Sequence, residues 1–205
     1  MFSKKSFVVV DTDAGLDDAW AILMLLATAK ENKDIKVVGI TCVHGNTTVE
    51  QTCINVLRTL ESSSGLEIPV YKGSSLPLVD LDENYKRNWK PFFGVDGFGC
   101  AQHDNVPDSK LIKEENAVVA LNRIVNEQKG EVSLLCLGPL TNIALAVRTY
   151  PCFAENIKEV IIMGGNYKGL ARPGVRRMSE CGGPADEQVG TAAENQADVC
   201  GLDAV

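Results

Sequence analysis

Short apolar runs alternate with amphipathic segments and polar turns between residues 7 and 163 of the chain. Runs rich in β-branched residues and bounded by turn residues are typical of buried strands. Longer segments with apolar residues on one face are typical of helices. The predicted strands are 7–10, 35–42, 68–71, 132–137 and 157–163. The predicted helices are 17–27, 49–60, 114–128 and a fourth that starts at 138–139 and ends before 151.

Strands that alternate with helices indicate an α/β fold with a doubly wound, mostly parallel sheet. In such sheets, ligands bind outside the carboxyl ends of the strands. Four polar segments follow predicted strands: an acidic turn after residue 10, then VHGN, LGPLTN and MGGN. We therefore predict a single site built from these four segments. Residues 73–113 are irregular, and a loop of this length is uncommon unless it serves a site or an interface.

The acidic turn carries four carboxylates within eight residues, Asp11, Asp13, Asp17 and Asp18. Two like charges about 4 Å apart near a protein surface repel by about 4 kcal/mol. Asp11 and Asp13 face the same side of an extended strand end, whereas Asp17 and Asp18 diverge by roughly 100° at a helix start. A helix N-cap explains one such acid but not four. With two histidines and no paired cysteine spacing, oxygen ligation favours Ca²⁺ or Mg²⁺ over zinc.

The string DTDAGLDDAWAI resembles the amino-terminal signature of the inosine–uridine-type nucleoside hydrolases, DTDxGxDDAxAI. The family usually has proline where this chain has Ala14, and we expect that change to alter only the stiffness of the turn. The resemblance implies a nucleoside N-ribohydrolase. Such an enzyme uses bound Ca²⁺ to split a purine or pyrimidine nucleoside into ribose and free base.

The resemblance also implies metal ligands. Asp13 and Asp18 would ligate Ca²⁺ together with the main-chain carbonyl of Leu137 in LGPLTN. Asp13 would in addition serve as the general base that takes a proton from water. Asp11 is expected behind these ligands, where it would hold the turn.

Further residues are implied in sugar binding. Asp17 would accept a hydrogen bond from the ribose 2′-hydroxyl, Asn46 in TCVHGNTT would steady the sugar, and Asn166 in MGGN is a further candidate. On the residues alone, Asn46 is also explained by a left-handed turn after a glycine, and His44 by a scaffold role. In FFGVDGFG, which is like a family loop that often reads HGxDGxG, Phe93 stands where a histidine is common.

Composition narrows the class of partner. The chain has 205 residues, a net charge of −7 and a pI near 4.9, which argues against a nucleic-acid-binding surface. The longest apolar run, 19–27, is too short to cross a bilayer, and the first residues lack the pattern of a signal peptide. Seven cysteines, mostly in apolar segments, indicate reduced thiols. We therefore predict a cytosolic protein that binds a small molecule.

The character of the chain changes after residue 169. Residues 170–205 contain no Phe, Trp, Tyr or Ile and are typical of a flexible tail. We therefore predict a nucleoside hydrolase-like domain over 1–169 that is incomplete at its carboxyl end. The family domain continues further and supplies a late His–Asp pair, whereas no histidine follows His103 here. We expect weak or absent hydrolysis by this chain alone; the resemblance further implies a homodimer or homotetramer.

Two other functions remain open at this stage. A haloacid-dehalogenase-type Mg²⁺ phosphatase would use Asp11 as nucleophile and Asp13 as acid. That motif, however, has Thr or Val at the place of Gly15, and it leaves the Asp17–Asp18 pair unexplained. The other alternative is a non-catalytic relative that binds sugar or partners without turnover, which the missing late ligands support.

Overall fold

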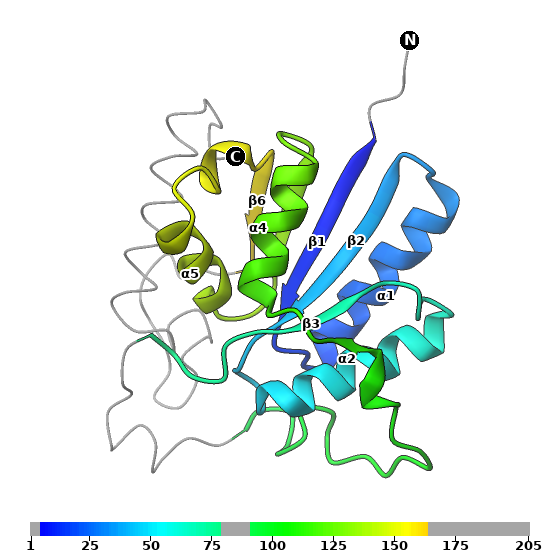
Figure 1. The fold of residues 1–205 in the computed structure, drawn as a ribbon. Coiled ribbons are helices and arrows are strands. Elements are labelled where there is room, and N and C mark those ends of the chain that lie inside the picture. The colour runs from blue at the N-terminus through cyan, green and yellow to red at the C-terminus, as the bar shows by residue number, and fades with distance from the viewer. Residues whose placement is uncertain (1–4, 79–90, 164–205) are drawn as a thin grey trace, which may run out of the picture.

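The computed structural model describes residues 5–78 and 91–163, and it shows a parallel sheet with helices on both faces (Figure 1). The strands are β1 (Ser6–Thr12), β2 (Ile35–Cys42), β3 (Val70–Lys72), β4 (Ile112–Lys113), β5 (Val132–Cys136) and β6 (Glu159–Ile162). The helices are α1 (Leu16–Glu31), α2 (Val49–Ser63), α4 (Ala117–Glu127) and α5 (Thr141–Thr149). Single 3₁₀ turns occupy Ser109–Leu111 and Ala154–Asn156.

The order of the strands places a reversal of the winding near the centre of the sheet. Their order is β4-β3-β2-β1-β5-β6, and each neighbouring pair is parallel. The sheet grows from β1 in one direction through β2 and in the other through β5, so the winding reverses between β1 and β5. Ligands bind at such a reversal, outside the carboxyl ends of the strands. The predicted doubly wound, parallel sheet is confirmed.

Two apolar cores lie on the two faces of the sheet. Successive residues of a strand point to opposite faces, so Val9 packs into one core and Val10 into the other. The first core joins the sheet to α4 and α5; its members include Leu121, Ile124, Leu134, Ile143 and Phe153. The second joins the sheet to α1 and α2; its members include Ile22, Ile40, Val56, Leu57 and Leu60. Both cores hold the carboxyl end of β1 from either side.

The ends of several elements differ from those predicted. Helix α2 continues to Ser63, three residues beyond its predicted end, and Ser64 then ends it with a φ of +58°. β3 starts two residues later than expected. The two-residue strand β4 lies in the segment that was predicted to be irregular, because two residues are too few to produce a periodic pattern.

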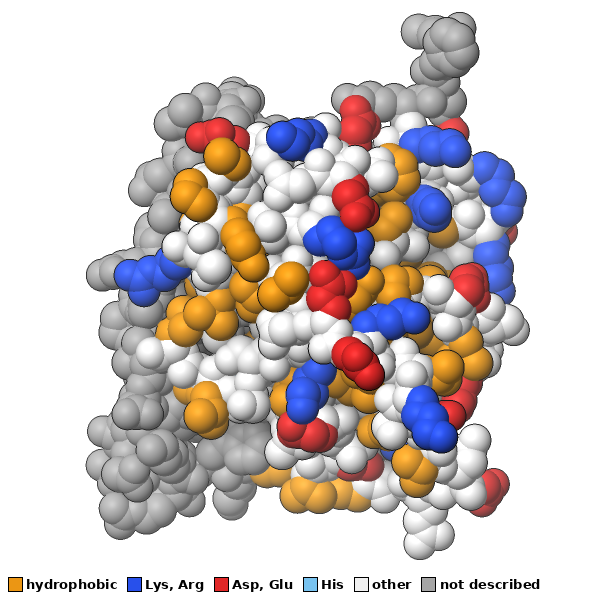
Figure 2. Space-filling model, in the orientation of Figure 1, with side chains coloured by type: hydrophobic (Ala, Val, Ile, Leu, Met, Phe, Trp, Pro, Cys, Tyr) orange, Lys and Arg blue, Asp and Glu red, His pale blue; other side chains and the backbone are white. Residues whose placement is uncertain are grey.

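The exposed surface agrees with the composition. On the face shown in Figure 2, acidic and basic side chains are interspersed, and no continuous basic surface is visible there. None of the helices in 5–78 and 91–163 has the length and apolar character that crossing a membrane requires. Five cysteines in the same ranges carry free thiols, of which Cys42, Cys53 and Cys136 are buried.

The core around α4 yields a stability prediction. Leu121 is completely buried, so Leu121→Ala removes apolar contacts and leaves a cavity. We expect the free energy of unfolding, measured by urea denaturation, to fall by about 2–5 kcal/mol. Val119→Ala, on the exposed side of the same helix, serves as the control and should change it by less than about 1 kcal/mol. Equal losses from the two variants would contradict this assignment of the core face.

Candidate active site at the carboxyl ends of β1 and β5

The acidic turn lies at the winding reversal of the sheet. The main-chain N–H of Leu137, directly after β5, donates to the Asp11 carbonyl at 2.8 Å. The next residue, Gly138, passes so close that a Cβ there would stand 2.8 Å from Asp13 Oδ1. The ends of β1 and β5 therefore meet at Asp11 and Asp13, as the positions of the polar segments predicted.

Asp11 is enclosed by the sheet. Its Oδ1 accepts hydrogen bonds from Thr41 Oγ1 at 2.5 Å and from Asn142 Nδ2 at 2.8 Å. Its Oδ2 is buried and has no hydrogen-bond partner among the described residues. Burial raises the pKa of Asp11 to about 7, although the two side-chain hydrogen bonds act in the opposite direction. Because Asp11 is enclosed in this way, it fits a residue that holds the turn. The same enclosure argues against the alternative in which Asp11 is a nucleophile.

Asn142 is a site residue that the sequence analysis missed. It is completely buried, and its Nδ2 donates to Asp11 Oδ1 and to the Cys42 carbonyl. Its Oδ1 accepts from the main-chain N–H of Ser74 at 2.9 Å. One amide thus joins the ends of β1 and β2 to the loop after β3. The only sequence signal was its place in LGPLTN, where a first-turn helix residue explained it equally well.

Asp13 and Asp18 form a buried, like-charged pair. Asp13 Oδ2 accepts from the main-chain N–H of Asn46 at 2.8 Å, and Asp18 Oδ2 accepts from that of Gly15 at 2.8 Å. Asp18 Oδ1 is buried without a hydrogen-bond partner in the described part of the chain. Burial raises the pKa of Asp18 to about 7. Burial, with the charge of Asp18 next in importance, raises the pKa of Asp13 well above its ordinary value.

The start of α1 separates the adjacent acids. Gly15 precedes the helix, so Asp18 lies one turn in and folds back to the Gly15 N–H. Asp17 is exposed, and its Oδ1 accepts from the main-chain N–H of Asp18 at 3.1 Å. The predicted divergence of the two side chains is confirmed: one points into the turn and the other toward solvent.

The turn between β1 and α1 has a conformation that proline does not adopt. Ala14 has a φ of +42°, whereas proline is held near −65°. The Ala14 N–H also donates to Thr12 Oγ1 at 2.9 Å, a donor that proline lacks. The expectation that alanine changes only the stiffness of this turn is therefore wrong, because the backbone path itself depends on it.

Two neighbouring segments enclose the turn. Asn55 of α2 donates to the carbonyls of Ala14 and Asp96 at 3.2 and 2.7 Å, which fastens the loop 91–99 to the turn. Thr47 Oγ1 donates to the Val95 carbonyl of the same loop at 2.8 Å. Part of residues 73–113, the segment predicted to be irregular, thus borders the site. A loop of this length was expected to serve a site or an interface. His44 Nε2 lies 3.2 Å from Thr141 Oγ1, and burial lowers the pKa of His44. These contacts fit the scaffold role.

The acidic turn offers a small number of oxygen donors of the kind that a hard cation binds. Within the described ranges, no three side chains of His, Cys, Asp or Glu gather closely enough to hold a metal ion. Two carboxylates do adjoin, those of Asp13 and Asp18, and Asp18 has a buried oxygen without a partner among the described residues. Gly138 lies against Asp13 and directly follows Leu137, whose main-chain carbonyl is the third donor that the resemblance implies. Such a set fits Ca²⁺. The predicted ribose residue Asn166 lies outside the described residues.

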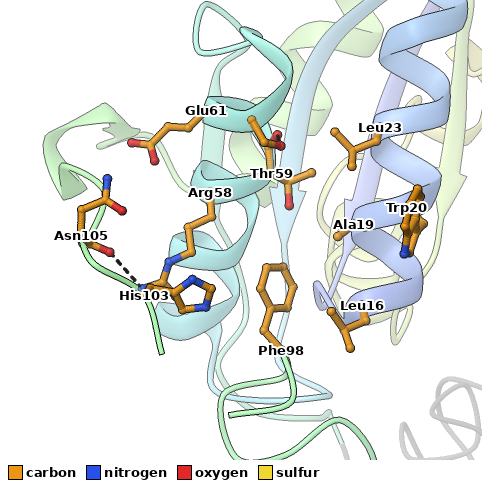
Figure 3. A pocket seen from close by; sticks show the side chains of 11 residues that line it. Leu16, Ala19, Trp20, Leu23, Arg58, Thr59, Glu61, Phe98, His103 and Asn105 are labelled. Atoms are coloured by element: carbon orange, nitrogen blue, oxygen red, sulfur yellow. Dashed lines mark hydrogen bonds between the residues drawn. The ribbon is translucent and has the colours of Figure 1, made fainter. Parts of the chain in front are cut away.

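A separate cavity of about 580 Å³ opens between α1 and α2 (Figure 3). Leu16, Trp20 and Leu23 form its wall on α1, while Arg58 and Phe98 approach from the other side. Neither Asp13 nor Asp18, which accept hydrogen bonds from Asn46 and Gly15, lines this cavity. We place the site at Asp13 and Asp18 and not at this cavity. Burying two carboxylates costs free energy, which indicates a function, whereas an open apolar cavity carries no such cost.

Comparison with known proteins gives a consistent picture. A sequence profile described as "Inosine-uridine preferring nucleoside hydrolase" matches residues 8–194. The chain is 36% identical over 160 residues to "Probable uridine nucleosidase 1" of Oryza sativa subsp. japonica, covering 78% of this chain and 47% of that protein. It is 34% identical over 170 residues to "Uridine nucleosidase 1" of Arabidopsis thaliana, with 83% and 48% covered.

Solved structures agree with the sequence comparison. The fold matches that of "Plant nucleoside hydrolase - PpNRh1 enzyme" with a TM-score of 0.77 and 28% identity, over 92% of this chain and 57% of that one. The chain spans about half the length of the curated relatives it matches.

The buried acids yield a prediction about pH. Folding raises the pKa of Asp11 and Asp18 from an ordinary value of 3.8 to about 7. Their protonated forms therefore favour the folded state, and this contribution is complete below pH 3.8 and lost as the pH rises through about 7. Without metal, we expect thermal unfolding to occur several degrees lower at pH 8 than at pH 5.5.

Asp18→Asn should reduce that difference, since the amide does not ionise. Asp34→Asn, an exposed acid that precedes β2, should leave it unchanged. Differential scanning calorimetry in the presence of a chelator provides the measurement. A wild-type midpoint that is equal or higher at pH 8 would show that these carboxylates do not resist ionisation.

Proposed function

The chain belongs to the inosine-uridine preferring nucleoside hydrolase family, and from this premise we propose that it hydrolyses nucleosides in a Ca²⁺-dependent reaction. The substrates would be purine or pyrimidine nucleosides, and the products ribose and free base. The observation that supports this most directly is the buried pair Asp13 and Asp18 at the winding reversal, with a carboxylate oxygen left without a partner among the described residues. Most buried polar atoms have a hydrogen-bond partner, and a bound cation would satisfy this oxygen.

Three oxygen donors would hold the ion. They are the carboxylates of Asp13 and Asp18 and the main-chain carbonyl of Leu137, on the two segments that meet at Gly138. Bound there, Ca²⁺ would offset the repulsion of the carboxylates and lower the pKa of water in the site. Asp11 would take no direct part, because Thr41 and Asn142 already hold its Oδ1 inside the sheet.

Asp13 would act as the general base. Its carboxylate lies where the ends of β1 and β5 meet, beside Gly138, so it would contact a water held in the site. Asp13 would take a proton from water as the water oxygen forms a bond to the anomeric carbon of ribose. The bond from that carbon to the base nitrogen breaks, and the base leaves with the electron pair and then gains a proton.

Asp17 and Asn46 would bind the sugar. Asp17 is exposed at the mouth of the turn and accepts only one hydrogen bond among the described residues, from the adjacent N–H. It therefore has capacity to accept from a ribose hydroxyl, and such a bond strengthens as the sugar gains positive charge in the transition state. Asn46 is anchored to Asp13 through its own N–H, so its amide group is carried beside the reacting centre.

Other expected properties stay predictions of this proposal. We predict that Asn166 contacts the ribose and that the hydrolase-like domain ends at residue 169, with a tail from 170. We also predict a homodimer or homotetramer and a cytosolic location. The phosphatase alternative is not supported, since the chain belongs to another family and Asp11 is enclosed. Binding of sugar without turnover is an outcome that the experiment below distinguishes.

A direct test is the release of free base from a panel of nucleosides, with and without Ca²⁺. We expect release by this chain alone to be slow, to require Ca²⁺ and to fall further, by about 10²–10⁴-fold, in Asp13→Asn, because the amide cannot accept the proton. Asp18→Ala should weaken Ca²⁺ binding in calorimetry. Asp34→Asn serves as the matched control and should retain wild-type turnover. Base release that persists after thorough chelation, or unchanged turnover in Asp13→Asn, would refute the proposal.

A further inference from the structure

Three side chains from separate segments meet beside Gly15. A Cβ at Gly15 would stand 2.4 Å from Asn46 Nδ2, 2.9 Å from Asp17 Oδ1 and 2.9 Å from Phe93 Cδ2. An amide, a carboxylate and the edge of an aromatic ring therefore all lie close against Gly15, and they leave no room for a side chain there. Gly15 is required there for lack of a side chain and not for its backbone angle, since its φ is −74°.

The loop that carries Phe93 is held firmly in place. Asn55 and Thr47 fasten its carbonyls at Asp96 and Val95 to the turn and to the loop after β2. Within the loop, Asp96 Oδ1 accepts from the N–H groups of Phe98 and Cys100 at 2.9 and 2.8 Å. Gly94 and Gly97 both have a φ of +77°, which lets the chain make these tight turns.

The Phe93 ring is supported from behind as well. Phe92 packs against it edge to face, with 4.8 Å between ring centroids. Phe92 itself is 77% exposed, whereas Phe93 is half-buried between the loop and the acidic turn. An aromatic ring is thus presented at a fixed place next to two polar side chains, and it has no hydrogen-bonding group of its own.

These three side chains together have the chemistry that binds a sugar. A ribose ring has hydroxyl groups along its edge and an apolar C–H face. Carboxylate and amide groups bind hydroxyls, while an aromatic ring offers a large apolar surface with a negative face that attracts C–H groups. A histidine at the same place would add a donor and an acceptor, which phenylalanine cannot supply.

We propose that Phe93 is a substrate-binding residue that packs against the C–H face of the ribose, while Asp17 and Asn46 bind its hydroxyls. The proposal rests on the proposed function, because it assigns the apolar wall of that same site. It makes sugar binding dependent on an aromatic surface and independent of any hydrogen bond from residue 93.

The test measures ribose affinity by calorimetry in saturating Ca²⁺, together with kcat/KM for a nucleoside. Phe93→Ala should weaken ribose affinity by about fivefold, which is within the range that aromatic contacts contribute. Phe93→Tyr keeps the aromatic ring and should retain affinity within about twofold. Val95→Ala truncates an exposed apolar side chain of the same loop and should match the wild type. Thermal unfolding of each variant checks that the loop change leaves the fold intact.

The outcomes separate this inference from the function on which it rests. If the wild type binds ribose and Phe93→Ala binds equally well, the role of Phe93 is overturned while the hydrolase proposal stands. If Phe93→Tyr loses as much affinity as Phe93→Ala, an aromatic wall is likewise overturned. If the wild type neither binds ribose nor releases base, both proposals fail. Loss in Phe93→Ala with retention in Phe93→Tyr and Val95→Ala supports the assignment.

Discussion

The buried negative charge at the end of β1 is the constraint on which this structure depends. Asp11, Asp13 and Asp18 are each at most 2% exposed, and burial raises the pKa of every one of them. Water solvates a carboxylate far better than a protein interior does, so such groups are rarely buried unless they are paired or coordinate a metal. The surrounding backbone supplies N–H groups at Gly15 and Asn46, which donate to one oxygen of Asp18 and one oxygen of Asp13, respectively. A positive ion is the simplest way to complete the arrangement.

The same constraint explains why the polar network extends across the sheet. Asp11 is joined through Asn142 to β2 and to the loop after β3, and Thr41 of β2 donates to the same oxygen. In a low-dielectric interior these hydrogen bonds are stronger than in water, and each unsatisfied partner is costly. The network therefore fixes the relative position of three strand ends. This network consequently gives Asp13 and Asp18, which lie next to it, a rigid support.

Much of this could be predicted from the sequence, because it depends on periodic patterns or on a long ordered motif. The apolar runs predicted the alternation of strands and helices, and the strand ends predicted where polar segments gather. Asn142 could not be found in this way, because a buried amide and a first-turn helix residue look alike until the tertiary contacts are known. The proximity of Phe93 to Gly15 was equally hidden, since 78 positions separate them in the chain and only the Asn55 and Thr47 contacts bring the loop back.

The turn itself shows how one constraint can be met by different local chemistry. A left-handed conformation costs a residue such as Ala14 about 1–2 kcal/mol relative to the right-handed region. Here that conformation directs the Ala14 N–H to Thr12 and its carbonyl to Asn55, so two buried polar groups are satisfied at once. Proline at residue 14 would remove the first hydrogen bond and exclude this backbone angle. In this chain the placement of Asp13 relative to Asp18 thus depends on a backbone route that proline at residue 14 would not allow.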